Sequence, residues 1–152
     1  GVERRGAPVA AFVRIDKERI DLRSQIYAPD HLIILDSTLL KNPATFKGFK
    51  KEGWVLINSK ISPEELKASP QMSEFKIACV DASGIAARNR LGSQTSPIVN
   101  TAILGAFCKI TEICSMDSVS NAIRKGVPIK PDANIKAAQE AYDEVLFQAN
   151  TK

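Results

Sequence analysis

Few residues of this chain have the chemistry of a catalytic group. The sequence holds one histidine, His31, and three cysteines, Cys79, Cys108 and Cys114. His31 stands at the start of an apolar run with no acid or nucleophile pattern beside it, so we interpret it as structural rather than as a general base. The cysteines are odd in number and lack the paired spacing of a metal site, which favours buried, reduced thiols. We therefore expect no self-sufficient catalytic or metal-binding set.

Residues 1–8 form the first candidate for ligand contact. Glu3 and Arg5 are two positions apart, so their side chains point the same way on an extended backbone, and Gly6 allows a phosphate or another backbone to approach. Arg5 could then hold a phosphate or a carboxylate. The alternative, which we favour, is a Glu3–Arg5 ion pair that fixes this loop against a neighbouring subunit.

The second candidate is the expected helix start at residues 96–101. Its unpaired backbone amides attract anions, and the side chains of Asn100 and Thr101 are placed to face a cleft there. The alternative is that these polar side chains only cap their own first turn. The sequence leaves both interpretations open, because it shows no Gly-x-Gly-x-x-Gly and no Walker loop that would supply a phosphate site.

Composition restricts the class of protein. The 152 residues suffice for one domain with its own core, and no run approaches the about 18 apolar residues of a membrane span. The net charge of +4 comes from scattered lysines and arginines with few aromatic residues, which argues against a nucleic-acid-binding surface. We expect a single soluble, cytoplasmic domain over residues 1–152 with no nucleic-acid or membrane partner.

Strands that alternate with helices predict an α/β fold with a three-layer, Rossmann-like open mixed sheet, helices on both faces and a C-terminal helical segment. The antiparallel part of the sheet is expected from an entry hairpin. The expected strands are 7–15 and 19–22 for that hairpin, then 31–36, 54–58 and 75–81; the expected helices are a short one near 37–46, one that begins at Ser62, then 83–91, 98–113, 117–125 and 132–148.

Residues 1–8 resemble the middle of a motif whose first half would precede them in the chain. A charged, glycine-bracketed loop runs directly into an apolar segment, so we expect that the first strand and its glycine-rich turn are absent from this sequence. A sheet without its first strand exposes an edge that must be covered, which argues for protein partners.

Two segments resemble the gamma subunit of pyruvate (or 2-ketoisovalerate):ferredoxin oxidoreductases. They are residues 1–9, Gly-Val-Glu-Arg-Arg-Gly-Ala-Pro-Val, and residues 97–106, Pro-Ile-Val-Asn-Thr-Ala-Ile-Leu-Gly-Ala. Pro29-Asp30 before an apolar strand and the strand 54–58 also follow that pattern. The resemblance covers essentially the whole chain.

The resemblance implies a subunit of a complex that oxidatively decarboxylates a 2-oxoacid, transfers the acyl group to coenzyme A and passes electrons to ferredoxin. The complex would hold thiamine diphosphate, Mg²⁺ and 4Fe-4S clusters in its alpha, beta and delta subunits, while this chain alone binds no cofactor. Ala7-Pro8 stands where relatives that use 2-oxoglutarate tend to have a second glycine, so pyruvate or a branched 2-oxoacid is expected.

The family's arginine- and glycine-rich turn has no counterpart here, so its contacts with coenzyme A cannot be carried over. Glu3, Arg5, Gly6, Asn100 and Thr101 match the two motifs and are the expected contacts with coenzyme A or a subunit interface. Two other functions remain open: a stand-alone nucleotide- or acyl-coenzyme A-binding module, and a scaffold subunit without a ligand. The sequence does not choose between pyruvate and 2-ketoisovalerate, or between a separate subunit and a fused polypeptide.

Overall fold

A computed structural model describes residues 9–148. Its sheet has four strands in the order β1 (Leu32–Ile34), β2 (Trp54–Asn58), β3 (Lys76–Val80) and β4 (Leu146–Phe147). The first three are parallel and β4 runs antiparallel to β3. The helices are the 3-10 helices η1 (Ser37–Lys41) and η2 (Pro43–Phe46), and α1 (Pro63–Lys67), α2 (Ala82–Arg88), α3 (Ala102–Thr111), α4 (Met116–Gly126) and α5 (Pro131–Glu144).

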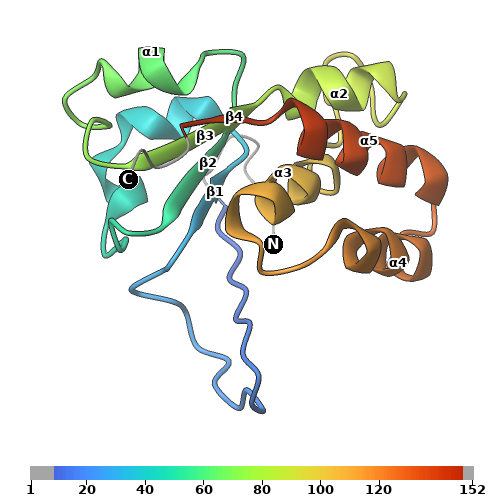
Figure 1. The fold of residues 1–152 in the computed structure, drawn as a ribbon, viewed down its shortest axis with the longest axis horizontal. Helices are drawn as coiled ribbons and strands as arrows, with labels where there is room; N and C mark the ends of the chain where they lie inside the picture. Colours follow the sequence, from blue (N-terminus) through green and yellow to red (C-terminus); the bar gives the residue numbers. More distant parts are fainter. Residues whose placement is uncertain (1–8, 149–152) are drawn as a thin grey trace, which may run out of the picture.

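The predicted three-layer α/β architecture is confirmed. Helices α2, α3 and α5 lie on one side of the sheet, and η1, η2 and α1 lie on the other (Figure 1). Alternate residues of the strands face the two helical layers, as the twofold repeat of a strand requires. Leu56, Ala78 and Val80 pack toward α2, α3 and α5, whereas Val55, Ile57, Ile77 and Cys79 pack toward the other layer. The central strands are therefore apolar on both faces.

The starts of α1, α2 and α4 follow from capping residues in the sequence. Ser62 accepts a hydrogen bond from the backbone N–H of Glu65, with Pro63 at the first helical position. Asp81 directly follows β3 and accepts from the N–H of Gly84, and Ser115 accepts from the N–H of Ser118. Each side chain satisfies a donor that the helix itself leaves unpaired.

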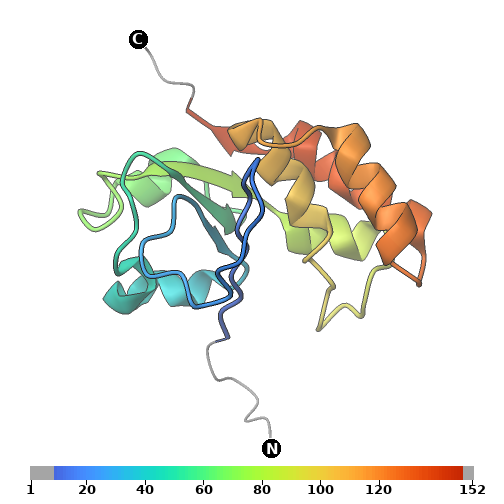
Figure 2. The same cartoon turned by 90° about the horizontal axis from the view of Figure 1, so that it is seen from below.

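Helices α3, α4 and α5 form a tightly packed helical layer (Figure 2). The closest approach is at Gly105 of α3, where an added Cβ would collide with the backbone carbonyl of Ala138 in α5. Glycine therefore lets the two backbones meet. Buried alanines of α5, at 137, 138 and 141, complete this contact.

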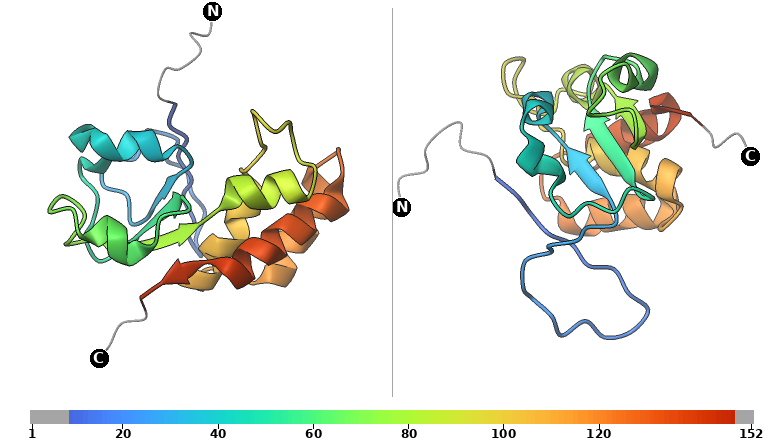
Figure 3. Two further views of the ribbon diagram at one scale, coloured as in Figure 1. Left: turned by 90° about the horizontal axis from the view of Figure 1, so that it is seen from above. Right: turned by 90° about the vertical axis from the view of Figure 1, so that its left-hand side faces the viewer.

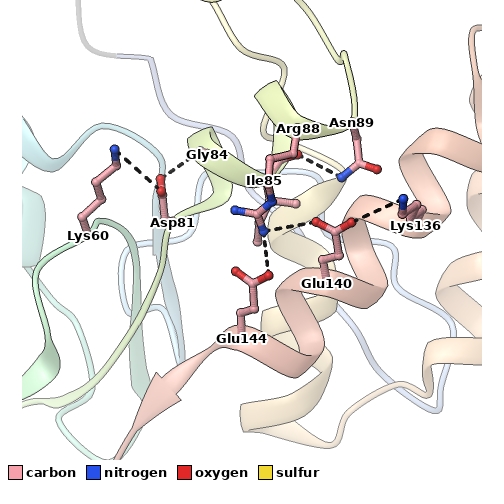
Figure 4. A network of polar contacts seen from close by, with 9 residues as sticks. All are labelled: Lys60, Asp81, Gly84, Ile85, Arg88, Asn89, Lys136, Glu140 and Glu144. Atoms are coloured by element: carbon pink, nitrogen blue, oxygen red, sulfur yellow. Dashed lines mark hydrogen bonds and ion pairs between the residues drawn. The ribbon is translucent and has the colours of Figure 1, made fainter.

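Ion pairs join α2 to α5 at the surface of the same layer (Figure 4). The Arg88 guanidinium donates to Glu140 at 3.2 Å and to Glu144 at 2.6 Å. These hydrogen bonds, Glu144 first, raise the pKa of Arg88. Because the side chains are partly exposed, these ion pairs add little to the free energy of unfolding. We infer that they mainly orient α2 on α5.

The predicted entry hairpin is wrong. Residues 9–28 contain no strand and form an extended arm that leaves the body of the molecule and returns to it (Figures 1 and 3). Arg14 joins the two legs of this arm by donating to the carbonyl of Ser24 at 2.7 Å. The alternating apolar pattern was present, but a strand also needs a partner for its backbone, and the described chain offers none here.

Among the other boundaries that differ from the prediction, two change the arrangement of the elements. Helix α3 begins at Ala102 instead of 98, because residues 92–97 fold back in a turn closed by an isolated bridge between Gly92 and Pro97, and the N–H of Ile98 donates to the carbonyl of Leu91 outside the helix. The last helix ends at Glu144, and Leu146 and Phe147 then pair with β3. The antiparallel part of the mixed sheet is therefore supplied by β4 and not by an entry hairpin.

Within residues 9–148, every helix is too short or too polar to cross a membrane.

Candidate ligand pocket

A pocket of about 360 Å³ lies between two connecting loops of the helical layer. One wall is the α2–α3 loop and the other is the α4–α5 loop with the first turn of α5. The volume falls in the range of small-molecule sites, about 300–1,000 Å³. Its lining residues are Arg90, Leu91, Gly92, Ile98, Asn100, Thr101, Gly126, Val127, Pro128, Ile129, Lys130 and Asn134.

A hydrogen-bond network fixes the floor of the pocket. The hydroxyl of Thr101 donates to Oδ1 of Asn134, whose side chain is only 5% exposed. The amide group of Asn134 donates in turn to the carbonyls of Ile129 at 3.2 Å and Lys130 at 3.0 Å. The network joins the start of α3 to the α4–α5 loop, so one buried asparagine sets the spacing of both walls.

Both walls hold residues in the left-handed backbone region. Arg90 has φ of 54° and Lys130 has φ of 50°, a conformation that residues other than glycine rarely adopt. The ammonium group of Lys130 donates to the backbone carbonyl of Arg90 at 2.9 Å and so closes the space between the loops. Backbone strain of this kind often gathers at binding sites.

The charge of the lining favours an anion. Arg90 and Lys130 are cationic, and the described residues around the pocket include no aspartate or glutamate. Asn100 and Thr101 add polar groups, while Ile98 and Val127 supply apolar walls. Such a site suits a ligand that combines phosphate groups with an uncharged part.

The structure brings two of the five expected contact residues together at this pocket. Asn100 is exposed and its Oδ1 accepts from the backbone N–H of Thr101 at 3.0 Å. Thr101 precedes α3 without capping it, because its hydroxyl is directed to Asn134. The other three, Glu3, Arg5 and Gly6, lie outside the described residues.

The sequence did not point to three polar or charged residues of the pocket: Arg90, Lys130 and Asn134. Asn134 carried a usable signal, since it occupies the same face of α5 as the buried alanines 137, 138 and 141. A polar residue on an apolar stripe needs a partner. Arg90 and Lys130 lay in segments that looked like ordinary exposed turns, so their proximity could not be read from the sequence.

His31 is held by two contacts within the fold. Its Nδ1 accepts from the backbone N–H of Trp54 at 3.1 Å, and its ring meets Phe107 edge to face at 5.8 Å. Burial lowers the pKa of His31, against an opposing effect of Asp30. A neutral ring with Nδ1 as acceptor fits these contacts.

The carboxyl ends of the parallel strands carry a second group of polar residues. Asn58, which ends β2, donates to the carbonyl of Leu35 at 3.0 Å and to Ser83 Oγ at 2.9 Å. Asp81, which follows β3, caps α2 and lies 3.9 Å from Lys60 (Figure 4). This edge is the usual ligand position in open α/β sheets. Here, however, these side chains are used to hold β1, β2 and α2 together.

The donor set of the described residues does not fit a metal or an iron–sulfur cluster. No three histidine, cysteine, aspartate or glutamate side chains gather there in a suitable arrangement. Cys79 is buried in β3, and burial raises the pKa of its thiol to about 12. It is therefore a core residue in its protonated form.

Comparisons with known proteins agree on one family. A family model described as pyruvate ferredoxin/flavodoxin oxidoreductase matches residues 1–144. Pyruvate synthase subunit PorC of Methanocaldococcus jannaschii is 46% identical over 147 residues, which cover 96% of this chain and 76% of that protein. The common gamma subunit of pyruvate/ketoisovalerate oxidoreductases from Thermococcus kodakarensis is 42% identical, with 96% of this chain and 77% of that protein covered.

A solved structure gives the same result. The crystal structure of pyruvate oxidoreductase subunit PORC from Thermotoga maritima matches with a TM-score of 0.67 at 30% identity. The match covers 79% of this chain and 65% of that chain, so the aligned part spans less than two thirds of the solved chain. The resemblance inferred from residues 1–9 and 97–106 is confirmed. The chain belongs to the pyruvate ferredoxin/flavodoxin oxidoreductase family.

Proposed function

We propose that the chain is the gamma subunit of a 2-oxoacid:ferredoxin oxidoreductase and that it forms part of the coenzyme A side of the site. The substrate best supported is pyruvate, which the names of its relatives share. The assembled enzyme would decarboxylate the 2-oxoacid, form acyl-coenzyme A and reduce ferredoxin. It would work in the cytoplasm with alpha, beta and delta partners, as separate subunits or as fused domains.

The observation that carries the subunit assignment is the exposed arm, residues 9–28. Its large apolar side chains project from the body of the molecule, although water disfavours such exposure. Val9 is 88% exposed, Val13 76% and Tyr27 77%. An arm of this kind would gain a buried surface only against another polypeptide. The remaining exposed apolar residues of the arm are Phe12, Ile15, Ile20 and Leu22.

The pocket supports a role toward coenzyme A. Coenzyme A carries several phosphate charges and an uncharged arm that ends in a thiol. Arg90 and Lys130 lie at the pocket beside Asn100 and Thr101, with no described carboxylate among them to repel phosphate. In this proposal these residues bind and orient coenzyme A, while Glu3, Arg5 and Gly6 act at the same side of the site or at the subunit interface.

The redox and decarboxylation chemistry is assigned to the partner subunits. Thiamine diphosphate with Mg²⁺ and 4Fe-4S clusters, held by those subunits, would supply the chemistry of decarboxylation and of electron transfer. The described residues of this chain offer no ligand set for such groups. Its own contribution is to bind one substrate, orient it and exclude water from it.

Reconstitution tests this proposal. The full-length chain is co-expressed with the alpha, beta and delta subunits, and the purified assembly is assayed for pyruvate- and coenzyme A-dependent reduction of ferredoxin. We expect activity from the complete assembly and none from the chain alone. Equal activity from an assembly that lacks this chain would refute its role as a subunit.

A second candidate is a stand-alone module that binds a nucleotide or acyl-coenzyme A, which the formed pocket favours. Calorimetry with coenzyme A on the isolated full-length chain separates the two. Tight binding without partners supports the module, whereas binding only in the assembly supports the subunit. If coenzyme A binds neither form but the assembly still requires the chain, the chain is a scaffold.

A further inference from the structure

The turn between α3 and α4 brings two thiols together. Sγ of Cys108 lies 2.8 Å from Sγ of Cys114, although the residues are six positions apart. A disulfide bond is about 2.05 Å long, so the two sulfur atoms need to move by less than about 1 Å to form one. Cys79, the third cysteine, lies in β3 in a different part of the core.

The backbone on both sides of the pair is held in place. Glu112 ends α3 in the left-handed conformation, with φ of 54°, and its N–H donates to the carbonyl of Cys108 at 2.9 Å. Ser115, next to Cys114, caps α4. This reversal of the chain directs Cys114 back to α3, so the proximity of the thiols follows from the fold and not from a flexible loop.

The two thiols differ in access. Cys108 is 2% exposed and packs with Val119, Ile123 and Ala138, whereas Cys114 is half-buried at the edge of this cluster. Burial, more than the contact with Cys114, raises the pKa of Cys108 to about 12. An oxidant from solvent therefore meets Cys114 first, and Cys108 is in position to react second.

We propose that Cys108 and Cys114 form a thiol pair that a hydroperoxide oxidises reversibly to an intramolecular disulfide. The Cys114 thiol ionises, and its thiolate attacks one peroxide oxygen, which breaks the O–O bond and gives a sulfenic acid and hydroxide; the hydroxide takes up the proton that the thiol released and leaves as water. Cys108 sulfur then attacks the Cys114 sulfur, forms the S–S bond and expels hydroxide, which leaves as water with the Cys108 proton. Two thiols and one hydrogen peroxide thus give one disulfide and two waters.

The disulfide would join α3 and α4 at the ends that lie away from the pocket. Helix α3 begins next to Thr101 and α4 ends at Gly126, both at the pocket, and the thiols lie where α3 passes into α4. A disulfide closes this turn, so the two helices would lose freedom to move relative to each other. This inference does not depend on the proposed function.

The test uses the full-length protein, purified under argon and treated with hydrogen peroxide. After unfolding, thiols are labelled with a maleimide and the mass is measured. We expect two fewer labels after oxidation, and dithiothreitol should restore them. Cleavage with trypsin separates residues 91–109 from 110–124, so the disulfide should appear as these two peptides joined within one chain.

Two variants, each with one of the two cysteines replaced, test the order in which the thiols react. In Cys108→Ala, Cys114 should still be oxidised but should stop at a sulfenic acid that dimedone traps; in Cys114→Ser, Cys108 should stay unmodified. Unchanged labelling of the native protein would overturn the proposal. So would oxygen adducts on Cys114 without the joined peptides, or a disulfide between two chains.

Discussion

The hydroxyl of Thr101 donates to the side-chain oxygen of Asn134, and this contact joins two segments that are 33 positions apart in the chain. Asn134 is buried, and its amide group holds the carbonyls of Ile129 and Lys130. The distance between the two walls of the pocket, the α2–α3 loop and the α4–α5 loop, therefore depends on the contact between Thr101 and Asn134.

Thr101→Val tests the structural part of that contact. Valine has nearly the shape of threonine but cannot donate, so the Asn134 oxygen loses its partner. We expect a loss of about 1–3 kcal/mol in the free energy of unfolding, measured by denaturant titration. Thr95→Val, at an exposed loop position, is the control and should change the stability by less than about 0.5 kcal/mol. Equal stability of Thr101→Val and the wild type would contradict the network.

Gly105→Ala tests the contact between α3 and α5. The added methyl group would collide with the carbonyl of Ala138, and the helices must separate to relieve it. We expect a loss of about 1–3 kcal/mol, seen as a lower denaturant midpoint. Gly126→Ala is the matched control, because nothing lies within 4 Å of its added Cβ. That variant should be neutral or slightly more stable, since alanine favours helix.

His31 should make the stability depend on pH. Its pKa is lowered by burial, so the unfolded chain binds more protons than the folded chain between the lowered value and about 6.5. The contribution of neutral His31 is thus complete above about pH 7, and it is lost as the pH falls through that window. Urea titrations at pH values from about 5 to about 7.5, where histidine changes its charge, would measure the free energy of unfolding across this window.

Two variants separate the charge of His31 from its hydrogen bond. His31→Asn keeps an acceptor for the Trp54 N–H but does not titrate, so it should remove the pH dependence and keep most of the stability. His31→Phe removes both and should cost about 1 kcal/mol more than the asparagine variant. If both variants keep the wild-type pH dependence, the effect belongs to another group.

The arm, residues 9–28, should act in assembly and not in stability. Val13→Asp with Leu22→Asp places charges on two exposed apolar positions. We expect the thermal unfolding of the isolated full-length chain to stay unchanged. Its affinity for the partner subunits, measured by co-purification, should fall about tenfold, which corresponds to about 1.4 kcal/mol of binding free energy. Ile61→Asp, an exposed apolar position on the body, is the control. Normal assembly of the arm variant would remove the main support for the subunit proposal.

The fold was predictable where burial decides the structure. The strands 54–58 and 76–80 are apolar on both faces, and the Ser62-Pro63 start has a proper cap, so pattern and packing agree there. The arm shows the limit of such patterns. It alternates apolar and polar residues, but no described strand lies beside it to pair with its backbone. Leu146 and Phe147 followed a helix without a glycine or proline to mark the end, so β4 was missed.

The candidate site was predictable only in part. Asn100 and Thr101 stood out because they belong to one contiguous motif before a helix. Arg90 lies in the α2–α3 loop, whereas Lys130 and Asn134 lie at the start of α5, and only the packing of α2, α3 and α5 brings the two segments together. A pocket built from loops far apart in the chain has no local pattern that would reveal it.

The most direct test of the proposed role is the Michaelis constant for coenzyme A in the reconstituted enzyme. Arg90→Gln with Lys130→Gln removes two positive charges from the pocket, and Arg124→Gln with Lys125→Gln removes the same charge from the exposed end of α4. If the pocket binds coenzyme A, the first pair raises the Michaelis constant by about tenfold or more while kcat stays within about twofold, as expected when only binding is lost. An equal Michaelis constant in both pairs would contradict the assignment of coenzyme A to this pocket.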